Sequence, residues 1–384
     1  MIKIHQGYVS EAEGVSTLST VIEIGDEKKD VRISVENEYG QFLSPERADY
    51  ALVGMLAYAL RNKHDIICEA PVTDELLYNI QEILIPTLFR SDKRNYPVKI
   101  HAEIAPPLEK VNIANAVRGG VGTGLSCGLD SFYTVLKHIN SPYPCQNLTH
   151  LAIFNIGGFH SLYRDVPLVK QKVFERADKA AAEMNLPLIK VESNFQHIIP
   201  MNNLRNHTYR DTMAVYALQK LWQIYYYASA YFFGEFSLNN NSRIASGSFD
   251  LFLLDCFSIS GLEFILSGGE GDRNDKLDLI VDNPIAQKYL HVCIRKDHNC
   301  GLCEKCLRTL LAIDAAGKLD NFRESFDIDA YLKMRKQAWI YCYDKAAIPH
   351  NASMYAKTYE VLYKRHKEFF DSITPETKRR FRAR

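Results

Sequence analysis

Four cysteines in the second half of the chain have the spacing of a metal site. Cys293, Cys300, Cys303 and Cys306 form the pattern C-x6-C-x2-C-x2-C. Four thiolates satisfy the tetrahedral coordination of Zn²⁺, and Gly301 permits the tight turn in which backbone N–H groups point at sulfur. An iron–sulfur cluster is the second choice for these ligands, and four inert buried cysteines are the third. Because a closed four-thiolate site leaves no position for a substrate water, we expect the metal to be structural.

The second candidate site is the polar turn Ser126-Cys127-Gly128-Leu129-Asp130-Ser131. It follows a predicted strand at 120–126, where glycine at every second position leaves one face without side chains, so we expect something to approach that face closely. A predicted helix at 132–138 comes next. The helix N-terminus would offer backbone N–H groups and a positive dipole end to a phosphate. A helix cap at Asp130 or Ser131 with nothing bound is the alternative.

The turn resembles the Ser-Gly-Gly-x-Asp-Ser motif of PP-loop ATP pyrophosphatases, which release pyrophosphate from ATP and transfer AMP to a carbonyl or carboxyl oxygen. Cys127 stands where those enzymes usually have glycine, and a side chain fits there only if φ is negative. The turn combined with the four cysteines resembles the 7-cyano-7-deazaguanine synthases of the queuosine pathway, over roughly residues 118–310. This resemblance implies a HUP-like, doubly wound α/β fold.

The resemblance also implies site residues. Asp130, Ser131 and Lys276 would be catalytic, with Asp130 helping to hold Mg²⁺ and Lys276 neutralising the α-phosphate of ATP. Phe154, Asn155 and Gly247 would contact the nucleotide, together with the turn residues Ser126, Cys127, Gly128, Leu129, Asp130 and Ser131. Gly157-Gly158 is either an adenosine contact or a simple turn. A solvated helix face is the alternative for Lys276 and Arg273. Surface placement is the simpler interpretation of four further candidates: His160, Arg164, His207 and Arg210.

These motifs predict ATP-dependent adenylation of a carboxylate or carbonyl substrate, followed by attack of ammonia or an amine. The acceptor is left open and could be a small carboxylate, a deazaguanine or a macromolecule. Sulfur transfer through Cys127 or Cys256 is the first alternative. A catalytically inactive protein that binds nucleotide or interacts with partners through its zinc site is the second.

Composition bounds the class of protein. The 384 residues are 47% apolar and 24% charged, as in ordinary globular proteins. Forty-six basic residues balance 46 acidic ones, so the chain has no strong nucleic-acid signature. The N-terminus lacks a signal-peptide pattern and no apolar run reaches the length of a membrane span, so we expect a cytoplasmic protein, with a homo-oligomer possible.

The strand and helix patterns around these residues predict an α/β fold. Residues 1–110 suggest an α+β domain, residues 111–310 the PP-loop domain with its zinc knuckle, and residues 311–384 a helical region. The first domain holds a hairpin at 15–35, helices at 47–62 and 73–89, and strands at 66–68 and 98–104. In the second, strands at 120–126, 149–156, 187–192, 243–247 and 261–267 alternate with helices at 129–139, 163–185 and 207–231. Such alternation predicts a doubly wound parallel sheet that binds ligands at the carboxyl ends of its strands.

Overall fold

The chain divides into two units, each of which is described by itself. The computed structural model describes residues 1–113, 119–157, 167–238, 245–348 and 352–374. The first unit comprises residues 1–125, 137–160 and 185–269, and the second comprises residues 126–136, 161–184 and 270–384. The chain crosses from one unit to the other directly after Leu125, so the candidate turn begins the second unit.

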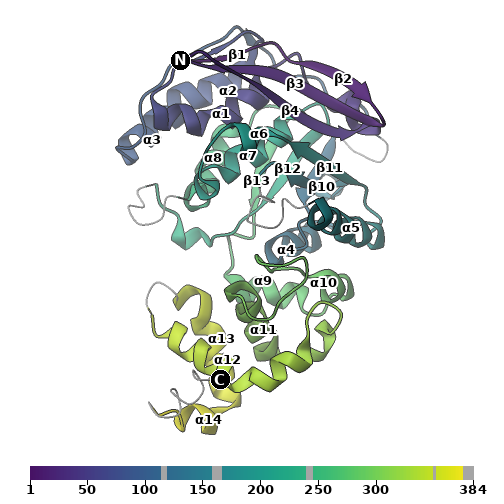
Figure 1. Cartoon of the computed structure of the whole chain (residues 1–384), viewed down its shortest axis with the longest axis vertical. Coiled ribbons are helices and arrows are strands. Elements are labelled where there is room, and N and C mark those ends of the chain that lie inside the picture. The colour runs from purple at the N-terminus through teal and green to yellow at the C-terminus, as the bar shows by residue number, and fades with distance from the viewer. Residues whose placement is uncertain (114–118, 158–166, 239–244, 349–351, 375–384) are drawn as a thin grey trace. The chain divides into compact units, whose positions relative to one another are not determined.

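Five parallel strands form the centre of the first unit (Figure 1). Their order across the sheet is β13-β12-β9-β10-β11, and all four pairings are parallel. The strands are β9 (Gly120–Gly124), β10 (His150–Asn155), β11 (Leu188–Ser193), β12 (Trp222–Ala228) and β13 (Glu263–Ser267). The α/β class is therefore confirmed, and this order is compatible with a doubly wound sheet. The order reverses between β9 and β12, the kind of position where such sheets bind ligands.

The N-terminal strands continue the same sheet through an antiparallel pairing of β11 with β4. The predicted hairpin is confirmed, because β3 and β4 pair antiparallel from Val15↔Glu36 to Ile24↔Glu27. The strands here are β1 (Ile2–Ile4), β2 (Tyr8–Ala12), β3 (Val15–Ile24), β4 (Glu27–Glu36), β5 (Ile66–Cys68) and β7 (Ile100–His101), with β6 (Val72–Thr73) pairing β8 (Ile104–Ala105) separately. The predicted division at about residue 110 stays a prediction.

One hydrophobic core runs through the first unit and joins α1 to α7. The two helices approach so closely at Gly54 that a Cβ atom there would lie 2.4 Å from the sulfur of Met213. The helical elements of this unit are η1 (Asn37–Phe42), α1 (Asp49–Asn62), α2 (Asp74–Tyr78), η2 (Asn79–Leu84), α3 (Ile85–Ser91), η3 (Pro144–Gln146), α6 (Phe195–Ile198), α7 (Asn203–Ala217), η4 (Phe233–Glu235), η5 (Ser246–Phe249) and α8 (Asp250–Phe257).

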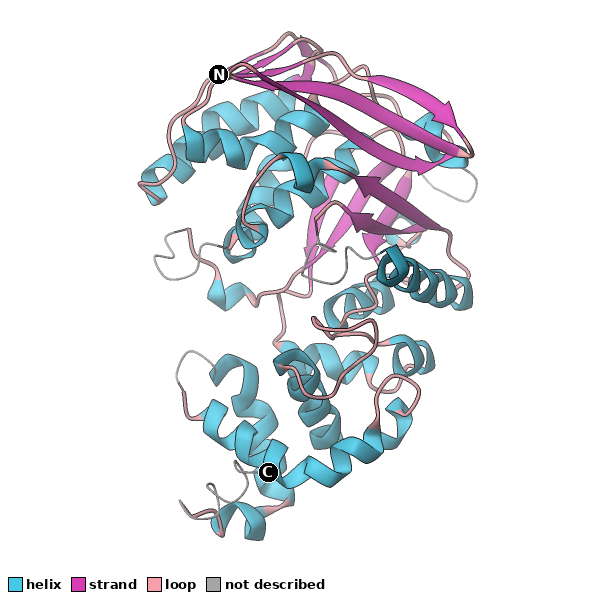
Figure 2. Cartoon of the chain, viewed as in Figure 1, coloured by secondary structure: helices cyan, strands magenta, loops and turns pink. Residues whose placement is uncertain are grey.

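Helices make up the second unit, as predicted for the end of the chain (Figure 2). The buried carboxylate of Asp314 on α11 accepts hydrogen bonds from Tyr331, Arg335 and Trp339 and so fixes α12 against α11. The helices are α4 (Leu129–His138, whose last two residues belong to the first unit), α5 (Pro167–Glu183), α9 (Arg273–Ile280), α10 (Pro284–Tyr289), α11 (Glu304–Ala316), η6 (Leu319–Phe322), α12 (Ile328–Ala346), α13 (Ala352–Arg365) and α14 (Lys367–Asp371). Within the described residues, no helix combines the length and the apolar character that a membrane span requires.

Two predictions from periodicity were wrong. The helix expected at 207–231 ends at Ala217, and the following run Trp222–Ala228 is the strand β12, where aromatic residues and Ile224 favour extended backbone in a buried sheet. In place of the strand expected at 243–247, the described residues begin the 3₁₀ helix Ser246–Phe249, and residues 243–244 lie outside the described part. The predicted helix at 163–185 is described from Pro167 onward, as α5.

The glycine face of β9 is covered by the protein itself. A Cβ atom on Gly122 would lie 2.2 Å from the ring of Trp222, and one on Gly120 would lie 2.9 Å from the carbonyl oxygen of Leu221. The close approach expected from the alternating glycines is therefore real. Because Trp222 and Leu221 make it, Gly120 and Gly122 serve sheet packing and are no evidence for a ligand, whereas a Cβ atom on Gly124 would meet no atom closer than 3.6 Å.

Candidate functional site

The polar turn of the second unit is held by hydrogen bonds among its own residues. The backbone N–H of Gly128 donates to Ser126 Oγ at 3.3 Å. The hydroxyl of Ser126 donates to Ser131 Oγ at 3.3 Å, and the Ser131 hydroxyl donates to the carbonyl of Gly128 at 3.0 Å. Ser126 is exposed, Gly128 is half-buried, and Ser131 stands in the first turn of α4. The turn therefore presents an ordered set of polar groups at a helix N-terminus.

Cys127 adopts the backbone conformation of the glycine that it replaces. Its φ is +57°, so the expectation of a negative φ was wrong. A side chain in this left-handed region costs about 1–2 kcal/mol. The backbone N–H of His291 donates to the Cys127 carbonyl at 2.8 Å, which helps to fix the strained residue. Burial raises the pKa of its thiol to about 12, so this cysteine is a packed side chain with little thiolate character.

Asp130 and Lys276 form an ion pair. The amine Nζ of Lys276 lies 2.8 Å from Asp130 Oδ1, and only 4% of the lysine side chain is exposed against 34% of the aspartate side chain. The alternative of a solvated helix face is thus wrong for Lys276. A capping box between Asp272 and Asp275 sets the start of α9 and so positions the lysine one turn later.

Three cations act on the Asp130 carboxylate. Burial opposes its ionisation, but the charges of Lys276 and Arg273, the hydrogen bond from Lys276 and the charge of Lys305 keep the pKa of Asp130 below its ordinary value. Asp130 is therefore ionised at neutral pH. The Asp130 carboxylate therefore lies among several positive charges of the second unit.

Arg273, one of these three cations, lies near a fourth cation, Arg308. Arg273 donates from Nη2 to the hydroxyl of Thr309 at 3.0 Å. Burial and the nearby charge of Arg308 lower the pKa of Arg273 to about 10, so it still carries its charge at neutral pH. The Nε atoms of both arginines are buried and have no acceptor among the described residues. Two guanidinium groups with spare donors suit a phosphate or carboxylate ligand.

The four predicted ligand cysteines converge at one point in the second unit. Their sulfur atoms all lie within 4.8 Å of one another, and the pairs Cys300–Cys306 and Cys293–Cys303 are each 4.0 Å apart. Tetrahedral Zn²⁺ with bonds of about 2.3 Å places its sulfurs at nearly this separation. The cluster could therefore hold a metal such as zinc.

Backbone N–H groups around the cluster point at sulfur, as predicted from its spacing. The N–H of Cys303 donates to Cys300 Sγ at 3.3 Å, and that of Cys306 donates to Cys303 Sγ at 3.4 Å. Gly301 has a φ of +69° and so makes the turn that glycine favours. Although burial opposes it, N–H groups of Leu302 and Cys303 lower the pKa of the Cys300 thiol to about 7. The Cys300 thiol is therefore prepared to bind as a thiolate, whereas burial raises the pKa of the Cys293 and Cys306 thiols.

Sequence reasoning missed Asn299, which braces the cluster. Its Oδ1 accepts from the backbone of Val292 at 2.9 Å and of Cys293 at 3.2 Å, and its Nδ2 donates to the carbonyls of Leu290 and Ser325. A buried asparagine with this many partners fixes the segment before the first ligand. That segment includes His291, whose backbone N–H donates to the Cys127 carbonyl. The same segment therefore contacts both the cysteine cluster and the polar turn.

The other nucleotide-binding candidates belong to the first unit. Phe154 stacks on Tyr225 with ring centroids 5.8 Å apart. Asn155 is buried and donates to Glu192 Oε2 at 3.2 Å, whereas its Oδ1 has no donor among the described residues. Gly247 lies where a Cβ atom would be 2.6 Å from the ring of Tyr231, so packing within the protein explains it. Of these residues, Asn155 keeps a free buried acceptor that a ligand could use.

Gly157 meets two demands that only glycine satisfies. Its φ is +127°, and a Cβ atom there would lie 1.8 Å from Nη1 of Arg210. Arg210 is fully buried, and His207 contacts Ser246 Oγ at 3.1 Å, so surface placement is wrong for Arg210 and His207 is part of a packed network. The remaining candidates lie outside the described residues: Gly158, His160 and Arg164.

Comparison of the chain with protein-family models, with curated proteins and with solved structures gives no match.

Proposed function

We propose that this chain is a PP-loop enzyme with a HUP-like fold that adenylates a carboxylate or carbonyl substrate with ATP. The observation that carries the proposal is the ion pair of Asp130 and Lys276 at the start of α4, together with the charges of Arg273 and Lys305. A phosphate chain is the ligand that suits an ordered polar turn, a helix N-terminus and several neighbouring cations. The motif of the turn selects ATP among such ligands.

In the proposed reaction, a substrate oxygen attacks the α-phosphorus of ATP. The bond to the bridging oxygen breaks, and that oxygen leaves with the electron pair as part of pyrophosphate. Ammonia or an amine then attacks the activated carbon, a new C–N bond forms, AMP leaves, and the nitrogen loses its proton to solvent. Lys276 would offset the negative charge that grows on the α-phosphate in the first step.

Two metal ions would have different tasks. Mg²⁺ bound with ATP would screen the phosphates, and Asp130 is the carboxylate in the turn that could hold it. Zinc bound to the four cysteines would have all its positions filled, so it supplies no chemistry and stabilises the segment that supports the Cys127 carbonyl.

Sulfur transfer receives less support from the side chains. It requires a reactive thiolate near the nucleotide. Burial raises the pKa of Cys127 and of Cys256 to about 12, which leaves both thiols protonated at neutral pH. An adenylating enzyme needs neither thiol, and this is why we place adenylation first.

The test is release of pyrophosphate and AMP from ATP and Mg²⁺ with ammonia and a panel of carboxylates that includes 7-carboxy-7-deazaguanine. Asp130→Ala and Ser131→Ala should each abolish release, whereas Asp282→Ala, which removes an exposed partner of Lys318 in the same unit, should retain it. Equal release by all four proteins would refute the assignment. ATP binding without turnover on any carboxylate would favour the inactive nucleotide-binding alternative, and turnover on other carboxylates alone would change the acceptor and keep the chemistry.

A further inference from the structure

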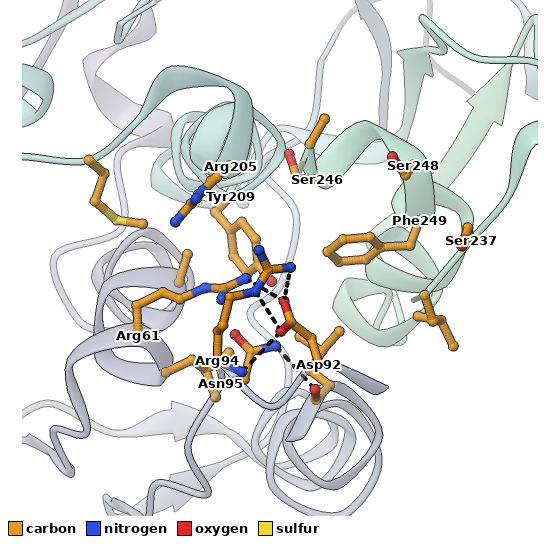
Figure 3. Close-up of a pocket in the computed structure, with 16 residues that line it drawn as sticks. Arg61, Asp92, Arg94, Asn95, Arg205, Tyr209, Ser237, Ser246, Ser248 and Phe249 are labelled. Carbon is orange, nitrogen blue, oxygen red and sulfur yellow. Dashed lines mark hydrogen bonds and ion pairs between the residues drawn. The ribbon is translucent and has the colours of Figure 1, made fainter. Parts of the chain in front are cut away.

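A pocket in the first unit lies between the N-terminal helices and the central α/β part (Figure 3). Arg61 comes from α1, and Asp92 and Arg94 from the turn after α3. Arg205 and Tyr209 come from α7, more than a hundred residues later. Neither the polar turn nor the cysteine cluster contributes to this pocket, so it does not depend on the proposed function.

Asp92 is the one acidic residue among the described residues that line the pocket, and two arginines already donate to its carboxylate. Arg94 donates from Nε to Oδ1 at 2.8 Å and from Nη2 to Oδ2 at 2.9 Å, and Arg61 donates from Nη2 to Oδ2 at 2.9 Å. Burial opposes ionisation of Asp92, but these hydrogen bonds lower its pKa to about 2. The carboxylate is therefore fully charged at neutral pH, and its lone pairs are largely taken.

Arg205 brings a third cation that Asp92 does not neutralise. Among the described residues its side chain has no ion pair and no hydrogen bond. Burial lowers the pKa of Arg205 from its ordinary value, and repulsion by the charges of Arg61 and Arg94 lowers it further. Counted over the described lining residues, three cations and one anion leave two positive charges in the pocket.

One unused donor also faces the pocket, because Arg61 Nη1 is buried without an acceptor among the described residues. Ser246 and Ser248 line the pocket and are nearly fully buried, and Ser237 lines it too. The Ser246 hydroxyl already contacts Thr208 and His207. Phe249 closes the same side (Figure 3). A pocket lined by guanidinium groups and hydroxyls, with a net positive charge, favours an oxyanion as its ligand. The two N–H groups of an arginine match the oxygens of a phosphate in particular.

The size of the pocket limits the ligand. Its volume of about 40 Å³ holds roughly three water molecules. This space accommodates a phosphate group and excludes a whole nucleotide base with its sugar. The lining therefore fits the end of a phosphorylated molecule, whose remaining part would lie outside.

We propose that the pocket of Arg61, Arg94, Arg205 and the serines of η5 is a binding site for a dianionic phosphate group, either free phosphate or a phosphate monoester. The N-terminal part of the chain supplies two of its three cations. The site thus gives residues 1–110 a part in binding a ligand, together with α7 and η5.

The probe is inorganic phosphate, titrated calorimetrically into the full chain at low ionic strength. Lys276→Met serves as the background, because this change disables the candidate ATP site and leaves the pocket intact. Saturable binding should persist in that background. Adding Arg205→Gln should weaken it on the order of 10- to 100-fold, the effect of losing one charge-assisted donor pair. Adding Arg90→Gln, an exposed arginine of α3 that does not line the pocket, should leave binding unchanged.

Protection from chemical modification tests the same site without a variant of the pocket. Phenylglyoxal should modify Arg205 in the wild-type chain, and phosphate or a phosphate monoester should protect it, as measured by peptide mass spectrometry. Binding that Arg205→Gln leaves unchanged, or Arg205 modification that phosphate does not slow, would overturn the proposal. Equal protection by succinate would overturn its phosphate specificity, and a stronger effect of the monoester than of free phosphate would identify the physiological source.

Discussion

Replacing Lys276 by methionine tests the candidate ATP site most directly. The change removes the cation 2.8 Å from Asp130 and keeps an apolar side chain of similar length in a position that is only 4% exposed. Breaking a fully buried ion pair costs about 3–5 kcal/mol, and an exposed pair contributes at most about 1 kcal/mol. Asp130 retains 34% exposure, so we expect Lys276→Met to lower the free energy of unfolding by about 2 kcal/mol.

The dependence of this loss on pH follows from Asp130. Its pKa in the folded chain lies below the ordinary value of the unfolded chain. The pair therefore contributes its full stability above the unfolded pKa of about 4 and loses it as the pH falls through the lower, folded pKa. Urea denaturation should give a constant difference between wild type and Lys276→Met from about pH 5 to pH 8, and a shrinking difference below about pH 4.

The same variant should lose most of its pyrophosphate release. Removing one preorganised charge from a transition state slows a reaction by about 10²–10³-fold. Lys318→Met is the matched control, because Lys318 pairs with Asp282 at the surface and both side chains are well exposed. A folded Lys276→Met protein that releases pyrophosphate at the wild-type rate, or that matches Lys318→Met in stability at every pH, would refute the reasoning.

Two further predictions concern the cysteine cluster and Gly157. Purified chain should contain one zinc ion per molecule by elemental analysis; Cys300→Ser and Cys306→Ser should lose it, and Cys145→Ser, which changes an exposed thiol outside the cluster, should keep it. Iron in place of zinc would point to the second choice of cluster. Gly157→Ala should lower the free energy of unfolding by more than about 2 kcal/mol, because positive φ and the clash with Arg210 both oppose a Cβ atom. Gly25 has a φ of +61°, and a Cβ atom there would meet no atom within 4 Å, so Gly25→Ala should lower the free energy of unfolding by only about 1 kcal/mol in thermal denaturation. Similar losses of stability for the two variants would contradict the packing argument.

Spacing along the chain sufficed to predict the cysteine cluster and the hairpin of β3 and β4. Both depend on residues close in sequence, where a knuckle turn or a polar hairpin turn has a local cause. The helix predicted over 207–231 went wrong for the opposite reason. Leu218–Leu221 interrupts the pattern without proline or glycine, and only the neighbouring strands make the aromatic run of β12 a buried strand.

The candidate site could be predicted in part. Asp130, Ser131 and Lys276 carry a local motif or a family position, and the structure places the lysine against the aspartate. Lys305 acts on Asp130 and Arg308 on Arg273, and nothing in the spacing of these residues along the chain indicated it. The pocket around Arg205 had no sequence signal at all. Its arginines come from three separate segments, and each one alone resembles an ordinary solvated charge.

The antiparallel pairing of β4 with β11 covers one edge of the five parallel strands. On the side away from β10, β4 is the partner that covers β11 within the described chain. A fragment beginning at about residue 111 would leave Glu192 and Ser193 of β11 without their partners on β4 and would uncover Met213, which packs on α1. Open edge strands of this kind recruit other chains. We therefore expect the shorter fragment to aggregate, even though it retains every residue of the predicted ATP site.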